Sequence, residues 1–197
     1  MGEIRAAGSL DVPGAYSVCL RTADAGSDGT ALYSNPDLLG HIYVGPYLAG
    51  QPEFAFVIAD EEGVAGYVLG AADTRSFERW LEQLWWPTLR SQYPLTGGTS
   101  LDAELIEHFH SPVTAPDEVV EKYPAHLHID LLPRAQGRGL GRQMLETLFA
   151  ALRQRGVQGI HLDVGADNHN AIAFYRHLGF TELARGSDSI YLGMELS

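Results

Sequence analysis

The chain has 197 residues, enough for one domain with its own core and too few to require two. Hydrophobic residues make up 45% and charged residues 19%, which argues against a disordered chain or a fibre. The net charge of −12 and the lack of an apolar run of about 18 residues oppose nucleic-acid or membrane binding. The only cysteine, Cys19, excludes an internal disulfide, and the first residues lack a secretory pattern, so we expect a cytoplasmic protein.

The charges are divided unevenly along the chain. The first 133 residues contain 19 acidic and 6 basic residues, whereas the rest contain 6 acidic and 7 basic residues. We interpret the first part as suited to attracting a cation and the second as able to hold an anion.

Short elements are predicted at the start of the chain. Residues 3–6 have the pattern of a strand, and the capping signals at Ser9 or Asp11 predict a helix after it. A second short helix is expected from Asn35-Pro36-Asp37, with Gly45-Pro46 breaking its pattern.

The middle of the chain predicts a β-hairpin and then a helix. Residues 53–59 and 64–71 are apolar and β-branched or aromatic, and a turn-forming acidic segment with a glycine separates them. Residues 76–91 have helical spacing, although Pro87 is expected to kink or end the helix. Residues 94–122 have the least ordered pattern and are interpreted as a loop over a site or an insertion.

From residue 125 the predicted order is strand, helix, strand, helix, strand, strand. In the first strand, every second residue is apolar, so Leu127, Ile129 and Leu131 are expected on one face. In the first helix an apolar residue recurs every four positions, at Leu140, Met144, Leu148 and Leu152. No repeat or linker is found, so the sequence predicts one α/β (α+β) domain with a mixed sheet.

The segment that joins this first strand to its helix is the strongest functional signal. Glycines at 137, 139 and 141 allow close approach of a ligand to the main chain, and unpaired N–H groups at a helix start favour an anion such as a diphosphate. A plain glycine-rich turn is the alternative. The dinucleotide pattern fails because Arg142 stands where its last glycine is needed, and no Gly-Lys-Ser/Thr of a P-loop is present.

Two motifs resemble the GNAT superfamily of N-acetyltransferases. Gln136, Gly139 and Gly141 match its Gln/Arg-x-x-Gly-x-Gly/Ala signature, and the segment from Asn168 to Phe180 is similar to its closing segment. The resemblance implies the GNAT fold, a mixed and mostly antiparallel sheet of about seven strands flanked by helices. It also implies acetyl-CoA as acetyl donor and no metal.

The first half extends the resemblance to the acetyltransferase-like C-terminal domain of O-GlcNAcase. The similar segments are Gly45-Pro46-Tyr47, residues 52–57, residues 63–70 and Tyr123-Pro124, together with Asp130. This implies a stand-alone, bacterial-type relative without a glycosidase domain. The glycine-rich motif is degraded in the animal domain and complete here, which favours cofactor binding.

The family resemblance assigns expected roles to residues of a single domain, 1–197. Residues 1–124 would form the acceptor-side half and 125–197 the acetyl-CoA-binding half. The expected cofactor-binding residues are Leu131, Leu132, Gln136, Gly137, Arg138, Gly139, Leu140, Gly141, Arg142, Asn168 and Tyr175. Main-chain N–H groups would supply most contacts. Asn168 is expected to orient the cofactor, cap the helix or do both, and Tyr175 is either the general acid for the departing thiolate or a core aromatic.

Three polar residues alternate with the apolar ones on the first of these strands. His126, His128 and Asp130 therefore project from the opposite face, and all three are candidates for acceptor binding. Asp130 is the first choice to bind or deprotonate the acceptor amine. The alternative is a polar strand face packed on the amino-terminal helices.

Other functions compete with this prediction. The same three residues begin like the His-x-His-x-Asp-His zinc motif, but Leu131 replaces the last histidine, so a zinc hydrolase is the weaker alternative. A protein that binds acetyl-CoA as a sensor, without transferring the acetyl group, is a second alternative. The main expectation is direct transfer, in a ternary complex, to a small cationic amine in preference to a histone tail. The oligomeric state is left open, with a homodimer as one candidate.

Overall fold

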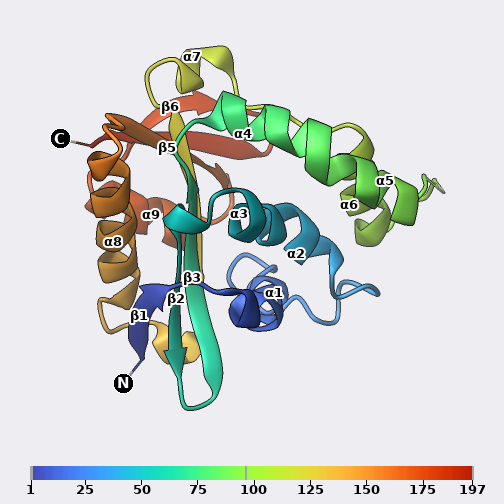
Figure 1. Ribbon diagram of the computed structural model, residues 1–197, viewed down its shortest axis with the longest axis horizontal. Coiled ribbons are helices and arrows are strands. Elements are labelled where there is room, and N and C mark those ends of the chain that lie inside the picture. The colour runs from blue at the N-terminus through green and yellow to red at the C-terminus, as the bar shows by residue number, and fades with distance from the viewer. Residues whose placement is uncertain (1, 96, 197) are drawn as a thin grey trace.

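A central seven-stranded sheet organises the molecule (Figure 1). The computed structural model describes residues 2–95 and 97–196. The strands lie in the order β1-β2-β3-β4-β5-β7-β6, and only the β4–β5 pair is parallel. Their bounds are β1 Glu3–Ala6, β2 Ala55–Asp60, β3 Gly63–Ala71, β4 Ala125–Leu131, β5 Gly159–Gly165, β6 Thr181–Arg185 and β7 Ser189–Glu195. The mixed, mostly antiparallel sheet expected from the sequence is confirmed.

Helices cover both faces of this sheet. The bounds are α1 Val12–Leu20, α2 Leu38–Tyr43, α3 Gly45–Gly50, α4 Thr74–Trp80, α5 Trp86–Gln92, α6 Leu101–His110, α7 Asp117–Val120, α8 Leu140–Gln154 and α9 His169–His177. In Figure 1, α8 lies to the left of the sheet and α1, α2 and α3 lie to its right. None of these helices is long and apolar enough to cross a membrane, over the residues that the structure describes.

The two faces of the sheet bury separate clusters of apolar side chains. Helix α8 turns Met144, Leu148 and Leu152 into one cluster, where they contact apolar residues of β4 and β5 and side chains of α9. The other face buries side chains of α1 and α3 against β2 and β3. The alternation predicted for β4 is confirmed, because Leu127 belongs to the α8 cluster while its polar neighbours face the amino-terminal helices.

The structure corrects three local predictions. Residues 94–122 contain helices α6 and α7, and the Ser100 side chain caps the first of them. Gly45-Pro46 ends α2 but at once begins α3, because proline is favoured in a first helical turn. The helix expected over 76–91 is divided by a π-helical turn, Leu81–Trp85, and Pro87 lies in the first turn of α5.

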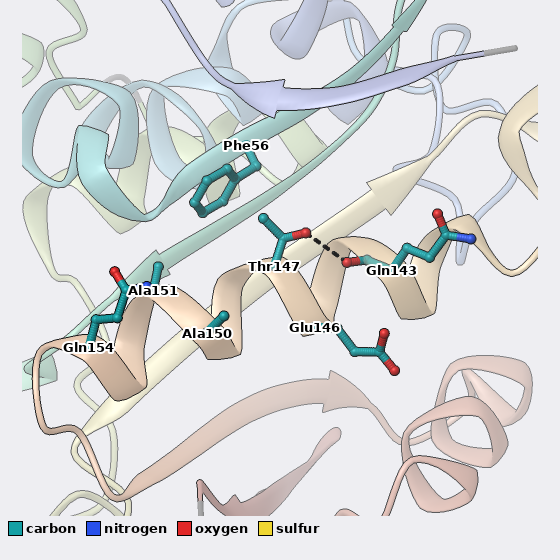
Figure 2. Close-up of a pocket in the computed structure, with 7 residues that line it drawn as sticks. All are labelled: Phe56, Gln143, Glu146, Thr147, Ala150, Ala151 and Gln154. Carbon is teal, nitrogen blue, oxygen red and sulfur yellow. Dashed lines mark hydrogen bonds between the residues drawn. The ribbon is translucent and has the colours of Figure 1, made fainter.

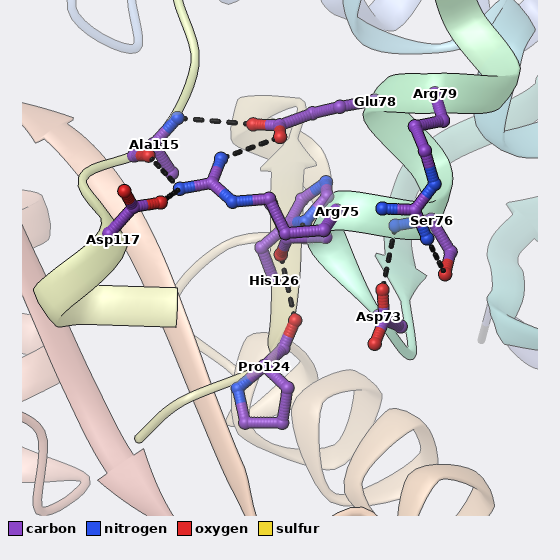
Figure 3. Close-up of polar contacts among 10 residues, drawn as sticks. Asp73, Arg75, Ser76, Glu78, Arg79, Ala115, Asp117, Pro124 and His126 are labelled. Carbon is purple, nitrogen blue, oxygen red and sulfur yellow. Dashed lines mark hydrogen bonds and ion pairs between the residues drawn. The ribbon is translucent and has the colours of Figure 1, made fainter. Parts of the chain in front are cut away.

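Arg75 explains why part of the segment after α6 is ordered (Figure 3). Its guanidinium donates to the Glu78 and Asp117 carboxylates at 2.6 and 2.5 Å, and to the Ala115 carbonyl at 2.6 Å. Glu78 in turn accepts from the Ala115 N–H. These contacts join α4 to the chain around the start of α7. Because the two segments are about 40 residues apart in the sequence, a local pattern cannot predict them.

Candidate active site

Strand β4 separates from β5 in the middle of the sheet. The two strands are paired only at Ala125↔Ile160 and His126↔His161, among the residues that the structure describes. On its other side β4 stays paired with β3 to Leu131↔Gly66, where an added Cβ on the glycine would lie 2.8 Å from the Asp130 carbonyl oxygen. Glycine at this position therefore lets β3 follow β4 closely while β5 diverges.

The separation leaves main-chain groups of β4 without a neighbouring strand. The Leu132 N–H donates to the Ala65 carbonyl of β3 at 2.8 Å. Because successive residues of a strand direct their main-chain groups to opposite sides, the groups of Ile129 and Leu131 point towards the β5 side. Residues 128–131 are all partly exposed although β4 is an interior strand. This unpaired stretch can therefore accept an extended ligand as if it were a further strand.

The glycine-rich turn begins directly beyond this stretch. Gly137 and Gly139 both have φ of 73°, in the left-handed region, and no heavy atom lies within 4 Å of the place where a Cβ would stand. Gln143 N–H donates to the Gly139 carbonyl in the first helical turn of α8. The N–H groups of residues 140–142 precede it and have no helical acceptor. The predicted anion site is thus an open turn at the start of a 15-residue helix.

The side chains predicted to bind the cofactor lie in different surroundings. The Gln136 amide donates to the Leu131 carbonyl at 2.8 Å, and so joins the turn to the unpaired end of β4. Arg138 is exposed, and Arg142 is an exposed partner of Glu146 at 2.8 Å. Leu132 is buried and its N–H is used within the sheet, so it supports the site by packing.

The two predicted residues of α9 lie at its start and in its middle. Asn168 is the N-cap, and its side chain accepts from the Ala171 N–H at 3.1 Å, so its predicted capping role is confirmed. Tyr175 is 8% exposed and packs in the α8 cluster, and its hydroxyl has no hydrogen-bond partner among the described residues. Burial, and then the charge of Asp130, raise the pKa of Tyr175, so its hydroxyl keeps its proton at neutral pH.

Both ring nitrogens of His126 are hydrogen-bonded. Thr74 Oγ1 lies 2.7 Å from His126 Nδ1 and donates its single hydroxyl proton to the Pro124 carbonyl at 2.8 Å. Nδ1 must therefore carry the imidazole proton, and Nε2 accepts from the Tyr47 hydroxyl at 2.8 Å. Burial lowers the pKa of His126, which keeps it neutral. Because both of its ring nitrogens are already hydrogen-bonded, His126 has a structural role on this face of β4.

His128 differs from His126 although it lies on the same face of β4. Its ring packs edge-on against Tyr43 and Tyr47, with centroids 5.4 and 5.3 Å away. Neither ring nitrogen is hydrogen-bonded to another described residue, and the side chain is partly exposed. Burial lowers the pKa of His128 to about 4, so the ring is neutral at pH 7 and has an available lone pair.

Asp130 lies beside the end of the unpaired stretch and contacts the amino-terminal half. The Tyr67 hydroxyl donates to Asp130 Oδ2 at 2.5 Å. Burial raises the pKa of Asp130 to about 6, against the opposing effect of this bond. The carboxylate is thus ionised at neutral pH yet accepts a proton more readily than an exposed aspartate.

Sequence reasoning missed four tyrosines and Thr74 around these groups. Tyr43, Tyr47 and Tyr67 come from the first half of the chain, and Tyr191 from the last strand. Tyr47 and Tyr67 lie in segments that resemble O-GlcNAcase, but their hydrogen bonds to His126 and Asp130 depend on the tertiary structure.

A separate groove of about 570 Å³ lies on the outer side of α8 (Figure 2). Phe56 of β2 and six residues of α8 line it: Gln143, Glu146, Thr147, Ala150, Ala151 and Gln154. None of the residues predicted for catalysis, cofactor binding or acceptor binding belongs to it. The described residues also contain no group of three or more His, Cys, Asp or Glu side chains arranged to hold a metal, so they give the zinc alternative no support.

Comparison with solved structures supports an acetyltransferase fold. The crystal structure of SsHAT matches with a TM-score of 0.92 and 39% identity, covering 100% of this chain and 98% of that one. The structure of yncA from Salmonella typhimurium with its cofactor acetyl-CoA shares the fold, with a TM-score of 0.57 at 17% identity over 100% of this chain and 94% of that one.

Sequence comparison leads to the family. The model of the acetyltransferase (GNAT) family matches residues 104–180. Protein O-GlcNAcase of Rattus norvegicus is 28% identical over an alignment of 197 positions, which covers 94% of this chain but only 21% of the rat protein. The chain belongs to the GNAT acetyltransferase family, as its two motifs predicted. Members of this family use acetyl-CoA as the acetyl donor.

Proposed function

We propose that residues 1–197 form a single GNAT domain that transfers acetyl from acetyl-CoA directly to an amine of a small cationic acceptor. Acetyl-CoA and the acceptor would be bound together in a ternary complex. The unpaired stretch of β4 that ends at the glycine-rich turn carries this proposal. At this stretch, the proposed acetyl-CoA-binding half (residues 125–197) would lie next to the proposed acceptor-side half (residues 1–124).

The residues present fit acetyl-CoA. Main-chain N–H groups of residues 137–142 would hold the pyrophosphate at the start of α8. Main-chain groups of β4 would pair with the pantetheine amides, and the Leu131 N–H would donate to the thioester carbonyl. A donor placed in advance at such an oxygen stabilises the developing charge by about 3 to 4 kcal/mol. Bound acetyl-CoA supplies an activated acetyl group.

Tyr175 is the proposed general acid. Its hydroxyl has no described partner that would have to be displaced, and its raised pKa keeps the proton available. A thiolate leaving group, with a thiol pKa of about 8 to 9, accepts a proton from a nearby phenol when the two are brought together.

Asp130 is the proposed proton acceptor for the amine, and His128 the group that orients it. An ammonium group must lose a proton before it can attack, since its pKa is about 10.4 in water. Proton transfer to Asp130 removes a partly buried negative charge, which its raised pKa favours. The His128 lone pair would accept a hydrogen bond from the same nitrogen.

The charges on the acceptor side favour a cationic substrate. Burial and then Cys19 raise the pKa of the Tyr33 hydroxyl, and the carboxylates of Glu104, Asp102 and Asp24 add to the effect. Helix α6, which lies in the segment expected to close one side, contributes two of these carboxylates.

Two measurements test the proposal. Calorimetry with acetyl-CoA should show saturable binding, and thiol release should follow when small cationic amines are added. Binding without release over a panel of amines would identify an acetyl-CoA sensor instead. Comparable turnover of histone peptides would refute the preference for small molecules.

A further inference from the structure

Asp163 lies across the diverging strands from His128. The parallel register pairs His126 with His161, so two residues further on His128 and Asp163 stand opposite one another where pairing has ended. Asp163 shares a face of β5 with His161, because both alternate with the apolar positions of that strand. The Asp163 side chain is therefore on the acceptor side of the sheet, and it is exposed there although β5 is an interior strand.

Tyrosines from two other elements lie near the position of Asp163. Tyr191 of β7 is its register partner, and the charge of Asp163 contributes to the raised pKa of that tyrosine. Tyr43 of α2 packs its ring against His128, which stands opposite Asp163. Burial raises the pKa of Tyr43 to about 12, with Cys19, Tyr33 and last Asp163 adding to the effect. Both hydroxyls therefore stay neutral, and Asp163 is the anionic group among them.

No cation among the described residues is ion-paired with Asp163. Partial desolvation raises the pKa of Asp163, and the neighbouring Ser189 side chain and Val164 main chain only partly oppose this effect. A cationic ligand group at this position would remove that cost.

Asp163 and Asp130 face different neighbours. The Asp130 carboxylate is bonded to Tyr67 of β3, its register partner, on the side of β4 away from β5. Strands about 4.8 Å apart, with a rise of about 3.3 Å per residue, would put the Cα atoms of Asp130 and Asp163 about 8 Å apart, and the divergence increases this value. Two cationic groups on a short chain would be needed to occupy both carboxylates.

We propose that Asp163 binds a second positive charge of the acceptor, and that the substrates are diamines or longer polyamines. The reacting nitrogen would lie at His128 and Asp130, and the distal ammonium at Asp163 between Tyr43 and Tyr191. This inference rests on the proposed acetyl transfer and specifies its substrate class.

The test compares putrescine with butylamine, which have carbon chains of equal length and differ in the second amino group. Wild type should have a higher kcat/KM for putrescine. Asp163→Asn should lower kcat/KM for putrescine up to about fivefold, chiefly through KM, and leave butylamine unchanged, because only the distal charge loses its partner. Asp163→Glu, which keeps the charge, should retain the preference, and Glu61→Gln at the exposed tip of the β2–β3 hairpin should change neither substrate.

Acetyl-CoA affinity and melting temperature are measured for each variant. Equal kcat/KM for the two amines in wild type, or an equal loss for both in Asp163→Asn, would overturn the inference while leaving acetyl transfer intact. Absence of acetyl-CoA binding, or of thiol release from any amine, would instead overturn the proposed function.

Discussion

The Gln136 side-chain amide donates to the Leu131 main-chain carbonyl at 2.8 Å, and this bond joins the glycine-rich turn to the unpaired end of β4. It uses an acceptor on the β5 side of β4 and leaves the Leu131 N–H available. The two parts of the proposed acetyl-CoA site, at the pyrophosphate and at the thioester, are thus connected by one side chain.

Gln136→Ala is expected to weaken acetyl-CoA binding about fivefold, because a neutral hydrogen bond contributes about 1 kcal/mol. The side chain is exposed, so the melting temperature should hardly change. Calorimetry measures the affinity, and Gln154→Ala at the exposed end of α8 is the control. Unaltered affinity in Gln136→Ala would show that the turn is positioned without this bond.

Gly139→Ala tests whether the conformation of the turn matters for binding. Gly139 and Gly156 have φ of 73° and 76°, with open space where a Cβ would stand, and they lie at opposite ends of α8. Each alanine should cost about 1 to 2 kcal/mol of folding stability through the left-handed conformation. Only Gly139→Ala should also reduce acetyl-CoA affinity; an equal reduction in Gly156→Ala would contradict the proposed site.

Tyr175→Phe should reduce kcat by about 100-fold or more, the usual contribution of a general acid. Acetyl-CoA affinity and melting temperature should be retained, because the hydroxyl forms no described hydrogen bond and the ring continues to pack. Steady-state kinetics and calorimetry separate these effects. Full activity in Tyr175→Phe would remove the proposed role.

Asp130 should produce opposite pH effects on activity and stability. As a base it must be ionised, so kcat/KM should rise with pH through about 6. Since its folded-state pKa is raised from 3.8 to about 6, the folded state binds more protons in this window, and the free energy of unfolding falls as pH rises through it, by at most about 3 kcal/mol.

Asp130→Asn should therefore abolish the rise in kcat/KM and increase the melting temperature above pH 6, since it removes the partly buried charge. Tyr67→Phe, which removes the hydrogen bond to the carboxylate, should shift the midpoint to higher pH. An unchanged pH profile in Asp130→Asn would assign the proton acceptor elsewhere.

The local sequence pattern was sufficient to predict the β2–β3 hairpin, the amphipathic helix α8 and the glycine-rich turn. Strand alternation, helical spacing and turn glycines are all properties of residues close together in the sequence. It also placed Asn168 as a helix cap. The helices in 94–122 were missed because their order depends on distant contacts, such as those of Arg75 with Ala115 and Asp117.

The sequence by itself determined the family and the face of β4 on which His126, His128 and Asp130 lie. It could not distinguish the two histidines, since strand alternation gives them identical positions. Only the tertiary structure separated them: Thr74 and Tyr47, 52 and 79 residues away along the chain, occupy both nitrogens of His126, whereas His128 packs against rings that leave its nitrogens free of described partners. Hydrogen bonds between distant residues depend on how the chain packs, which a periodic pattern does not encode.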